Sequence, residues 1–196
     1  MLKTGFVGLG AMGLPMARNL HRAGLLTAVW NRSAEKARAL AGETGCTACA
    51  APEELAELCD VMVLCISADE DVLDIVGAIA PVVSPGTIVI DCSTVSAATA
   101  RQAASILSEK GCGFLDCPVS GGTEGARQGT LSIMAGGAAE DLEKARPVLE
   151  AMGRSVVHMG PAGLGQAAKA TNQVMVAGIN QAVTEALAFG RSQGLP

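Results

Sequence analysis

The segment Gly8-Leu9-Gly10-Ala11-Met12-Gly13 follows a short apolar run at residues 5–7 and precedes a stretch in which apolar residues recur at helical spacing. A strand, a glycine turn and the start of a helix, in this order, form the pyrophosphate site of dinucleotide-binding folds. The first glycine makes the turn, the second lets the backbone approach the phosphates, and the third lets the helix pack closely on the strand. The free N–H groups at the start of the helix favour an anion. Residues 8–13 are therefore predicted to bind a nucleotide cofactor.

Strand candidates and helix candidates alternate along residues 1–162. The strand candidates are runs at residues 4–7, 27–30, 61–65, 87–90, 113–115, 131–135 and 155–158, with a short one near Thr47. The helix candidates span residues 12–22, 34–41, 52–58, 70–79, 97–109 and 140–152. This alternation is typical of a mostly parallel sheet with helices on both faces. We therefore predict a doubly wound α/β domain of the Rossmann type over residues 1–162.

Residues 163–196 are predicted to form one long helix that differs in character from the rest of the chain. Only Lys169, Glu185 and Arg191 are charged, and no proline occurs before the last residue. A helix with apolar residues around most of its circumference is normally buried against other elements on several sides. Two readings remain open: another subunit covers this helix, or the chain is a fragment of a longer protein. We favour the fragment.

The composition argues against several classes of function. The net charge of −5 disfavours a broad basic face for nucleic acid. Polar residues interrupt every apolar run before it reaches the roughly 18 residues of a membrane span, and no signal-peptide pattern precedes the first strand. We therefore predict a cytoplasmic protein. The seven cysteines are expected to be reduced thiols. Cys46 and Cys49 have CxxC spacing, but no second Cys or His pair accompanies them, so no metal is expected.

The end of the second predicted strand indicates which nicotinamide cofactor is preferred. NAD-preferring sites usually carry an Asp or Glu about 20 residues after the glycine turn, where it binds the ribose 2′-hydroxyl. Here that place holds Asn31, Arg32 and Ser33, with no carboxylate. A guanidinium matches a 2′-phosphate with bidentate geometry, and Ser33 can cap the next helix as well as bind phosphate. These three residues therefore predict NADP(H) in preference to NAD(H).

Two later segments carry polar groups whose meaning the residues alone leave open. In residues 116–123, paired glycines follow a serine after a strand, which suits either an anion-binding nest of N–H groups or an ordinary loop. Lys169 and Asn172 are three residues apart and project from one face of the long helix. A lone lysine on an apolar helix either extends its ammonium to solvent or takes part in chemistry.

Taken together, these segments resemble the β-hydroxyacid dehydrogenase family, which includes 3-hydroxyisobutyrate dehydrogenases and tartronate semialdehyde reductases. The motifs that match, in chain order, are the glycine turn with its continuation through residue 17, residues 91–94, residues 116–122, residues 125–127, and residues 163–165 followed by Lys169 and Asn172. Two departures occur: Cys117 stands where alanine is common, and residues 65–67 vary the loop after the fourth strand. Neither removes a polar group that the chemistry needs.

The resemblance implies a role for each matching position. Lys169 is implied to be the general acid and base of a hydride-transfer reaction, and Asn172 to orient the substrate. Thr94 is implied to lie beside both the nicotinamide ribose and the substrate. The segment Cys65, Ile66 and Ser67 is implied to line the nicotinamide side of the cofactor, and the substrate carboxylate is implied to bind Ser120, Gly121 and Gly122.

The family also implies an all-helical C-terminal domain after the long helix, so that residues 163–196 become an interdomain helix. The chain contains the helix without that domain, and we expect it to form homo-oligomers through the helix. Three other readings stay open. A phosphogluconate dehydrogenase-like enzyme or an imine reductase-like enzyme would use the same scaffold, and a non-catalytic NADP-binding module would not need the lysine.

Overall fold

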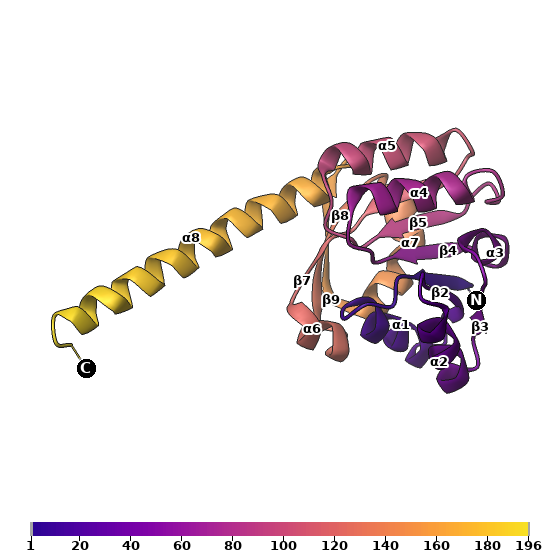
Figure 1. The fold of residues 1–196 in the computed structure, drawn as a ribbon. Helices are drawn as coiled ribbons and strands as arrows, with labels where there is room; N and C mark the ends of the chain where they lie inside the picture. The colour runs from indigo at the N-terminus through magenta and orange to yellow at the C-terminus, as the bar shows by residue number, and fades with distance from the viewer. Residues whose placement is uncertain (1, 196) are drawn as a thin grey trace.

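The computed structural model describes residues 2–195 as a nine-stranded sheet with helices on both faces and one long helix that projects from it (Figure 1). The strands are β1 (Thr4–Val7), β2 (Leu26–Trp30), β3 (Thr47–Ala48), β4 (Val61–Leu64), β5 (Ile88–Asp91), β6 (Gly113–Asp116), β7 (Val119–Ser120), β8 (Leu131–Gly136) and β9 (Gly153–Gly160). The helices are α1 (Gly13–Arg22), α2 (Ala34–Thr44), α3 (Pro52–Leu58), α4 (Asp69–Ile79), α5 (Ala97–Ser108), α6 (Gly122–Gln128), α7 (Ala139–Met152) and α8 (Leu164–Ser192).

The sheet confirms the predicted doubly wound order. Strands β3, β2, β1, β4, β5 and β6 lie side by side and pair in parallel. Because the chain runs outward from β1 in one direction and returns through β4 in the other, a crevice opens at the carboxyl ends of these two strands. Beyond β6, strand β8 pairs antiparallel, β7 pairs antiparallel with β8, and β9 pairs parallel with β8.

Alternate side chains of each central strand point into two separate hydrophobic cores, one on each face of the sheet. Phe6 and Val63 point to the core beneath α1, α2, α6 and α7, whereas Val7 and Leu64 point to the core beneath α3, α4 and α5. Successive side chains of a strand leave the sheet on opposite faces, so a strand covered on both sides must be apolar throughout. This is why the β4 sequence, Val61–Leu64, is an unbroken apolar run whose four residues are all buried.

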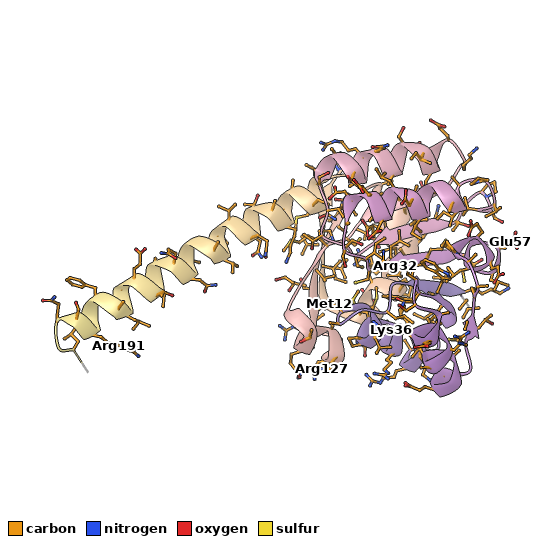
Figure 2. The ribbon with its side chains drawn as sticks, viewed as in Figure 1. Met12, Arg32, Lys36, Glu57, Arg127 and Arg191 are labelled. Carbon is orange, nitrogen blue, oxygen red and sulfur yellow. The ribbon has the colours of Figure 1, made fainter. Side chains whose placement is uncertain are left out.

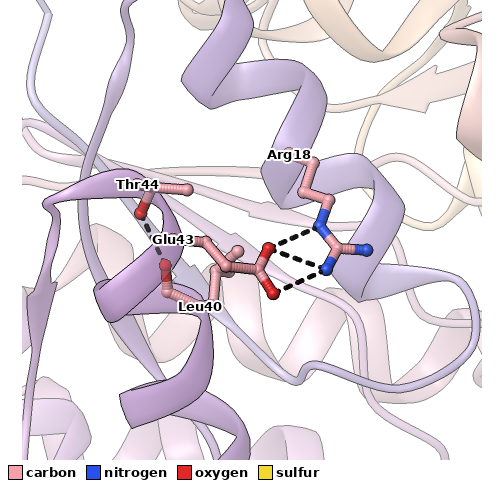
Figure 3. A network of polar contacts seen from close by, with 4 residues as sticks. All are labelled: Arg18, Leu40, Glu43 and Thr44. Atoms are coloured by element: carbon pink, nitrogen blue, oxygen red, sulfur yellow. Dashed lines mark hydrogen bonds and ion pairs between the residues drawn. The ribbon is translucent and has the colours of Figure 1, made fainter.

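A surface ion pair links the first two helices on one face of the sheet. The guanidinium of Arg18 in α1 donates from Nε and one Nη to the carboxylate of Glu43 in α2, with N···O distances of 2.7–3.1 Å (Figure 3). Thr44 Oγ1 donates to the carbonyl of Leu40 within the last turn of α2 (Figure 3). Both members of the ion pair are about half exposed, so this pair contributes less than about 1 kcal/mol to stability and mainly orients α2 on α1.

The structure corrects the sequence analysis over the segment after β6. Residues 116–123 were predicted to be a turn, but they contain the short strand β7 and the start of α6. Neither element has a periodic apolar pattern, because β7 is two residues long and α6 has seven residues with glycines at its start and centre. Only pairing with β8 and packing against α1 reveal them.

The long predicted helix exists as α8, and little more than its first turns are covered. Its start packs against β8, β9 and α5, and its buried residues are Gly165, Gln166 and Lys169. The rest projects away from the body, with Arg191 near its far end (Figures 1 and 2). Large apolar side chains are exposed along it, namely Leu164, Val174, Met175, Val176, Ile179, Val183, Leu187 and Phe189. Among the helices of residues 2–195, none has the length and apolar character needed to span a bilayer.

Candidate active site

The glycine turn between β1 and α1 presents free backbone donors at the crevice. Gly8 has a φ of +96°, which only glycine adopts readily, and it turns the chain sharply out of β1. The N–H of Leu9 donates to Asn31 Oδ1 at 2.7 Å, which ties the turn to the end of β2. Within the described part of the chain, the N–H groups of Gly10, Ala11 and Met12 make no hydrogen bond. Three unpaired donors before a helix form a site for an anion.

A cavity of about 500 Å³ opens beside the turn where β2 ends. Arg32, Ser33 and Lys36 line it on the α2 side, and Asp71 and Asp74 line it on the α4 side. Figure 2 labels Arg32 and Lys36, which line this same cavity. Ser33 occupies the N-cap position of α2 but its side chain makes no capping bond, contrary to the capping role expected of it. The α2 side of the cavity therefore offers two cations and a hydroxyl, and the α4 side offers two carboxylates.

The ion pair that Arg32 forms in this cavity is long and exposed to solvent. Arg32 Nη1 lies 3.6 Å from Asp71 Oδ1, and the side chain of Arg32 is 86% exposed. A pair this exposed contributes little to stability, so the guanidinium is available to a ligand. Lys36 was missed in the sequence analysis. Its position four residues after Arg32, on the first turns of α2, is the signal that could have found it.

A second cavity, of about 490 Å³, lies where α8 meets the ends of β4, β5 and β7. It contains ten of the predicted site residues, which are Met12, Cys65, Ile66, Ser67, Thr94, Ser120, Gly121, Gly122, Lys169 and Asn172. The two cavities share Cys65, Ile66 and Ser67. The two cavities therefore adjoin at this segment, and the pair, with Arg32 in one cavity and Lys169 in the other, is called the path below.

Ser93 holds the shared segment in place, although the sequence analysis assigned it no role of its own. Its hydroxyl accepts a hydrogen bond from the N–H of Ile66 at 2.9 Å, and its own N–H donates to Asp91 Oδ1 at 3.0 Å. Burial raises the pKa of Asp91 to about 6. Burial also raises the pKa of the Cys65 thiol to about 12, so this thiol is a neutral wall of the cavity and not a nucleophile.

Lys169 is the buried cation of the site. Its exposed fraction is 9%, and among residues 2–195 no other lysine or arginine is buried. Within the same residues, no carboxylate oxygen lies within 4.0 Å of its Nζ. Burial lowers the pKa of Lys169 below its ordinary value. An amine with these properties exchanges protons closer to neutrality than a free lysine does.

The other predicted residues divide between those that face the path and those that support it. Gly8, Gly10, Asn31, Arg32 and Ser33 line the first cavity. Leu9 and Gly13 are buried, and they support the turn instead of lining a cavity. Ala11 is exposed on the turn and lines neither cavity.

Comparisons with known proteins match this architecture. Residues 3–160 match the family described as the NAD-binding domain of 6-phosphogluconate dehydrogenase. The chain is 42% identical, over its whole length, to the NAD-dependent L-serine dehydrogenase of Pseudomonas aeruginosa, of which it spans 66%.

Two solved structures are similar over the described fold. A structure of 3-hydroxyisobutyrate dehydrogenase from Mycobacterium tuberculosis with L-serine superimposes with a TM-score of 0.96 at 35% identity, covering 100% of this chain and 67% of that one. A structure of Psf3 in complex with NADP+ and 2-OPP superimposes with a TM-score of 0.88 at 32% identity, covering 98% of this chain and 69% of that one.

Proposed function

The chain belongs to the β-hydroxyacid dehydrogenase family, the group of the 3-hydroxyisobutyrate dehydrogenases, and from this premise we propose a specific reaction. The reaction is the NAD(P)-dependent interconversion of a small β-hydroxyacid and its semialdehyde or keto acid. The observation that carries the proposal is the pair of adjoining cavities, with Arg32 in one and Lys169 in the other. A dinucleotide that occupied both would have its adenosine end at Arg32 and its nicotinamide end near the buried amine.

The residues along this path fit a dinucleotide cofactor. The three unpaired N–H groups of the glycine turn suit the pyrophosphate, and the segment Cys65, Ile66 and Ser67 suits the nicotinamide side. Thr94 lines the same cavity, where it would lie beside the nicotinamide ribose and the substrate. When bound, the nicotinamide supplies or accepts the hydride.

The protein supplies the proton and the alignment in this proposal. During reduction, Lys169 Nζ donates a proton to the carbonyl oxygen of the substrate, and during oxidation the neutral amine takes it back from the hydroxyl. Asn172 lies one turn further along α8, lines the same cavity and orients the substrate. Ser120, Gly121 and Gly122 line the opposite wall and bind the substrate carboxylate through their polar groups.

The substrate class is tested by a reduction assay with NADPH and a panel of small semialdehyde acids. Matched aldehydes that lack the carboxylate are the control. We expect turnover of the acids and a kcat/KM at least about tenfold lower for the aldehydes, since they lose charge-assisted hydrogen bonds. Turnover confined to a phosphorylated sugar acid, or to an imine, would instead favour one of the other enzymes with this scaffold.

We propose that the cofactor is NADP(H) in preference to NAD(H), because Arg32, Ser33 and Lys36 surround the cavity at the end of β2. The double substitution Arg32→Ala and Lys36→Ala is expected to weaken NADPH binding by about 10–100-fold, since two charge-assisted hydrogen bonds to the 2′-phosphate are lost. NADH binding is expected to stay within about twofold. Both Kd values follow from quenching of protein fluorescence or from calorimetry.

A matched control for the cofactor prediction is Arg38→Ala. Arg38 lies on the same helix, is exposed, and lines neither cavity. This variant should leave both Kd values unchanged. Equal weakening of NADPH and NADH in the double variant would contradict a preference based on the 2′-phosphate.

We also propose that residues 1–162 form the nucleotide-binding unit and that residues 163–196 form an interdomain helix through which copies associate. Support comes from the exposed apolar side chains of α8, since a large exposed apolar surface favours association. The substitutions Ile179→Glu and Leu187→Glu are expected to shift sedimentation toward the monomer. A native chain that sediments as a monomer at every concentration would contradict this proposal.

The proposed location is the cytoplasm. All seven cysteines are free thiols, and a reducing compartment keeps them so.

A further inference from the structure

The first turn of α8 is hydrogen-bonded to the ends of two neighbouring strands. Asp116, the last residue of β6, accepts from the N–H of Gly163 at Oδ1 and from the N–H of Gln166 at Oδ2, both at 2.8 Å. The side chain of Gln166 then reaches the segment after β5. Its Oε1 accepts from the N–H of Val95 at 3.2 Å, and its Nε2 donates to the carbonyl of Ser93 at 2.8 Å. Asp116 and Gln166 are both buried.

Asp116 takes the place of the capping side chain that α8 lacks. The N-cap residue is Gly163, which has no side chain to satisfy the first N–H groups of the helix. Unpaired N–H groups at a buried helix start are costly, and a carboxylate satisfies them with charge-assisted bonds. The cap thus comes from a residue 47 positions earlier in the chain. It links the direction of α8 to the end of β6.

Glycines on both sides of this junction allow the close approach. A Cβ on Gly165 would lie 2.3 Å from the carbonyl oxygen of Asp116 and 2.5 Å from that of Met134. A Cβ on Gly136 would lie 2.5 Å from Asp116 Oδ1. These neighbours are largely backbone atoms or a carboxylate already held by two hydrogen bonds, so they have no room to yield. The first turn of α8 is therefore held in one position against the ends of β6 and β8.

Lys169 follows Gln166 by one helical turn, and α8 has no buried residue beyond Lys169. Thr94 lies between Ser93 and Val95, the two residues whose backbone Gln166 holds. We propose that Asp116 and Gln166 are positioning residues that fix Lys169 of α8 against Thr94 and the end of β6. This inference rests on the function proposed above, and it adds two residues that the sequence analysis did not assign to the site.

A purely stabilising role and a positioning role predict different results. If the pair only stabilises the fold, its loss lowers the melting temperature and leaves the properties of Lys169 in the folded state unchanged. If the pair positions Lys169, its loss lets the first turn move and exposes the amine to water. Because burial holds the pKa of Lys169 below its ordinary value, added exposure must raise that pKa.

The test replaces Gln166 by methionine, which keeps the length of the side chain but removes both of its hydrogen bonds. The pKa of Lys169 is measured by NMR on reductively dimethylated lysines, with Lys169→Arg to assign the signal. The rate of reduction is measured in parallel at saturating NADPH. We expect the pKa of Lys169 to rise in Gln166→Met, the rate to fall by about 10–100-fold, and the Kd for NADPH to stay within about twofold. Asp116→Asn, which leaves one of the two N–H groups without an acceptor, is expected to act in the same direction.

Ile79→Val is the control, because Ile79 is the buried last residue of α4 and lines neither cavity. This variant should lower the melting temperature without changing the pKa of Lys169. A folded Gln166→Met protein with the native pKa and a rate equal to that of the control would overturn the inference. Because the NMR measurement needs no turnover, the two proposals fail separately. A raised pKa in Gln166→Met together with an active Lys169→Met protein would refute the proposed function and support the positioning role.

Discussion

Replacement of Lys169 by methionine is expected to lower the rate of reduction by about 10²–10⁴-fold, the usual contribution of a general acid or base. Methionine fills a similar volume, so the cavity keeps its walls but loses the proton donor. Lys169 lines the cavity at α8, where the nicotinamide is proposed to bind, and not the one at Arg32. The Kd for NADPH should therefore stay within about twofold. The measurements are single-turnover oxidation of NADPH and equilibrium binding.

The pH dependence of the native protein provides a second readout of the same group. Only the neutral amine accepts a proton, so alcohol oxidation should speed up as the pH rises through the pKa of Lys169. Carbonyl reduction needs the ammonium form, so its rate should fall over the same range. Because burial lowers this pKa, both changes should begin below the ordinary range of a lysine. Profiles that are flat from mildly acidic to alkaline pH would exclude Lys169 as the base.

Substitution of Gly13 by alanine is expected to destabilise the fold by about 3 kcal/mol and to abolish NADPH binding. A Cβ at position 13 would lie 1.9 Å from the carbonyl oxygen of Gly8 and 3.0 Å from the ring of Phe6. Gly8 is the turn itself, and Phe6 is fully buried in the core beneath α1. Relief of this clash would require α1 to move away from β1. Urea unfolding gives the stability, and calorimetry gives the Kd.

Two other glycines serve as matched controls for Gly13. A Cβ on Gly10 would meet no atom within 4 Å, and Gly10 is exposed on the turn, where the pyrophosphate is proposed to bind. Gly10→Ala should therefore keep its stability but bind NADPH at least about tenfold more weakly, because the backbone no longer approaches the phosphates. Gly42 lies on α2 with equally open space, so Gly42→Ala should leave NADPH binding unchanged and raise stability by about 0.5–1 kcal/mol, since alanine is the better helix former. Native stability in Gly13→Ala would show that close helix–strand packing does not depend on this glycine.

Much of the architecture was predictable because its causes are local. The strand β1 and the helix α3 have the predicted bounds, since an apolar run and a proline-led helix carry their own signals. The ends of the other predicted elements differ by a few residues. By contrast, β7 and α6 were missed, and the antiparallel pairing of β8 with β6 was not foreseen. Such short elements take their conformation from neighbours distant in the chain.

In the candidate site, too, some residues were predictable from local sequence and others depend on contacts between distant segments. Arg32 and Asn31 were found because their distance from the glycine turn along the chain is characteristic of the fold. Lys36 was missed, although it lies in the first turn of α2, just after Arg32 and Ser33. Asp116 and Gln166 were assigned no positioning role, because their bonds join residues 47–73 positions apart. No local pattern encodes such bonds.

The amino-acid sequence by itself determined the doubly wound sheet, the cofactor turn and the chemical types of the site residues. Those properties follow from side-chain periodicity and from backbone freedom at glycine, which act over a few residues. Tertiary structure alone decided that Lys169 is buried with no carboxylate of residues 2–195 beside it, that Asp116 caps α8, and that the two cavities adjoin. These outcomes depend on strand order and on close contact between distant segments, and the burial that lowers the pKa of Lys169 exists only once those segments meet.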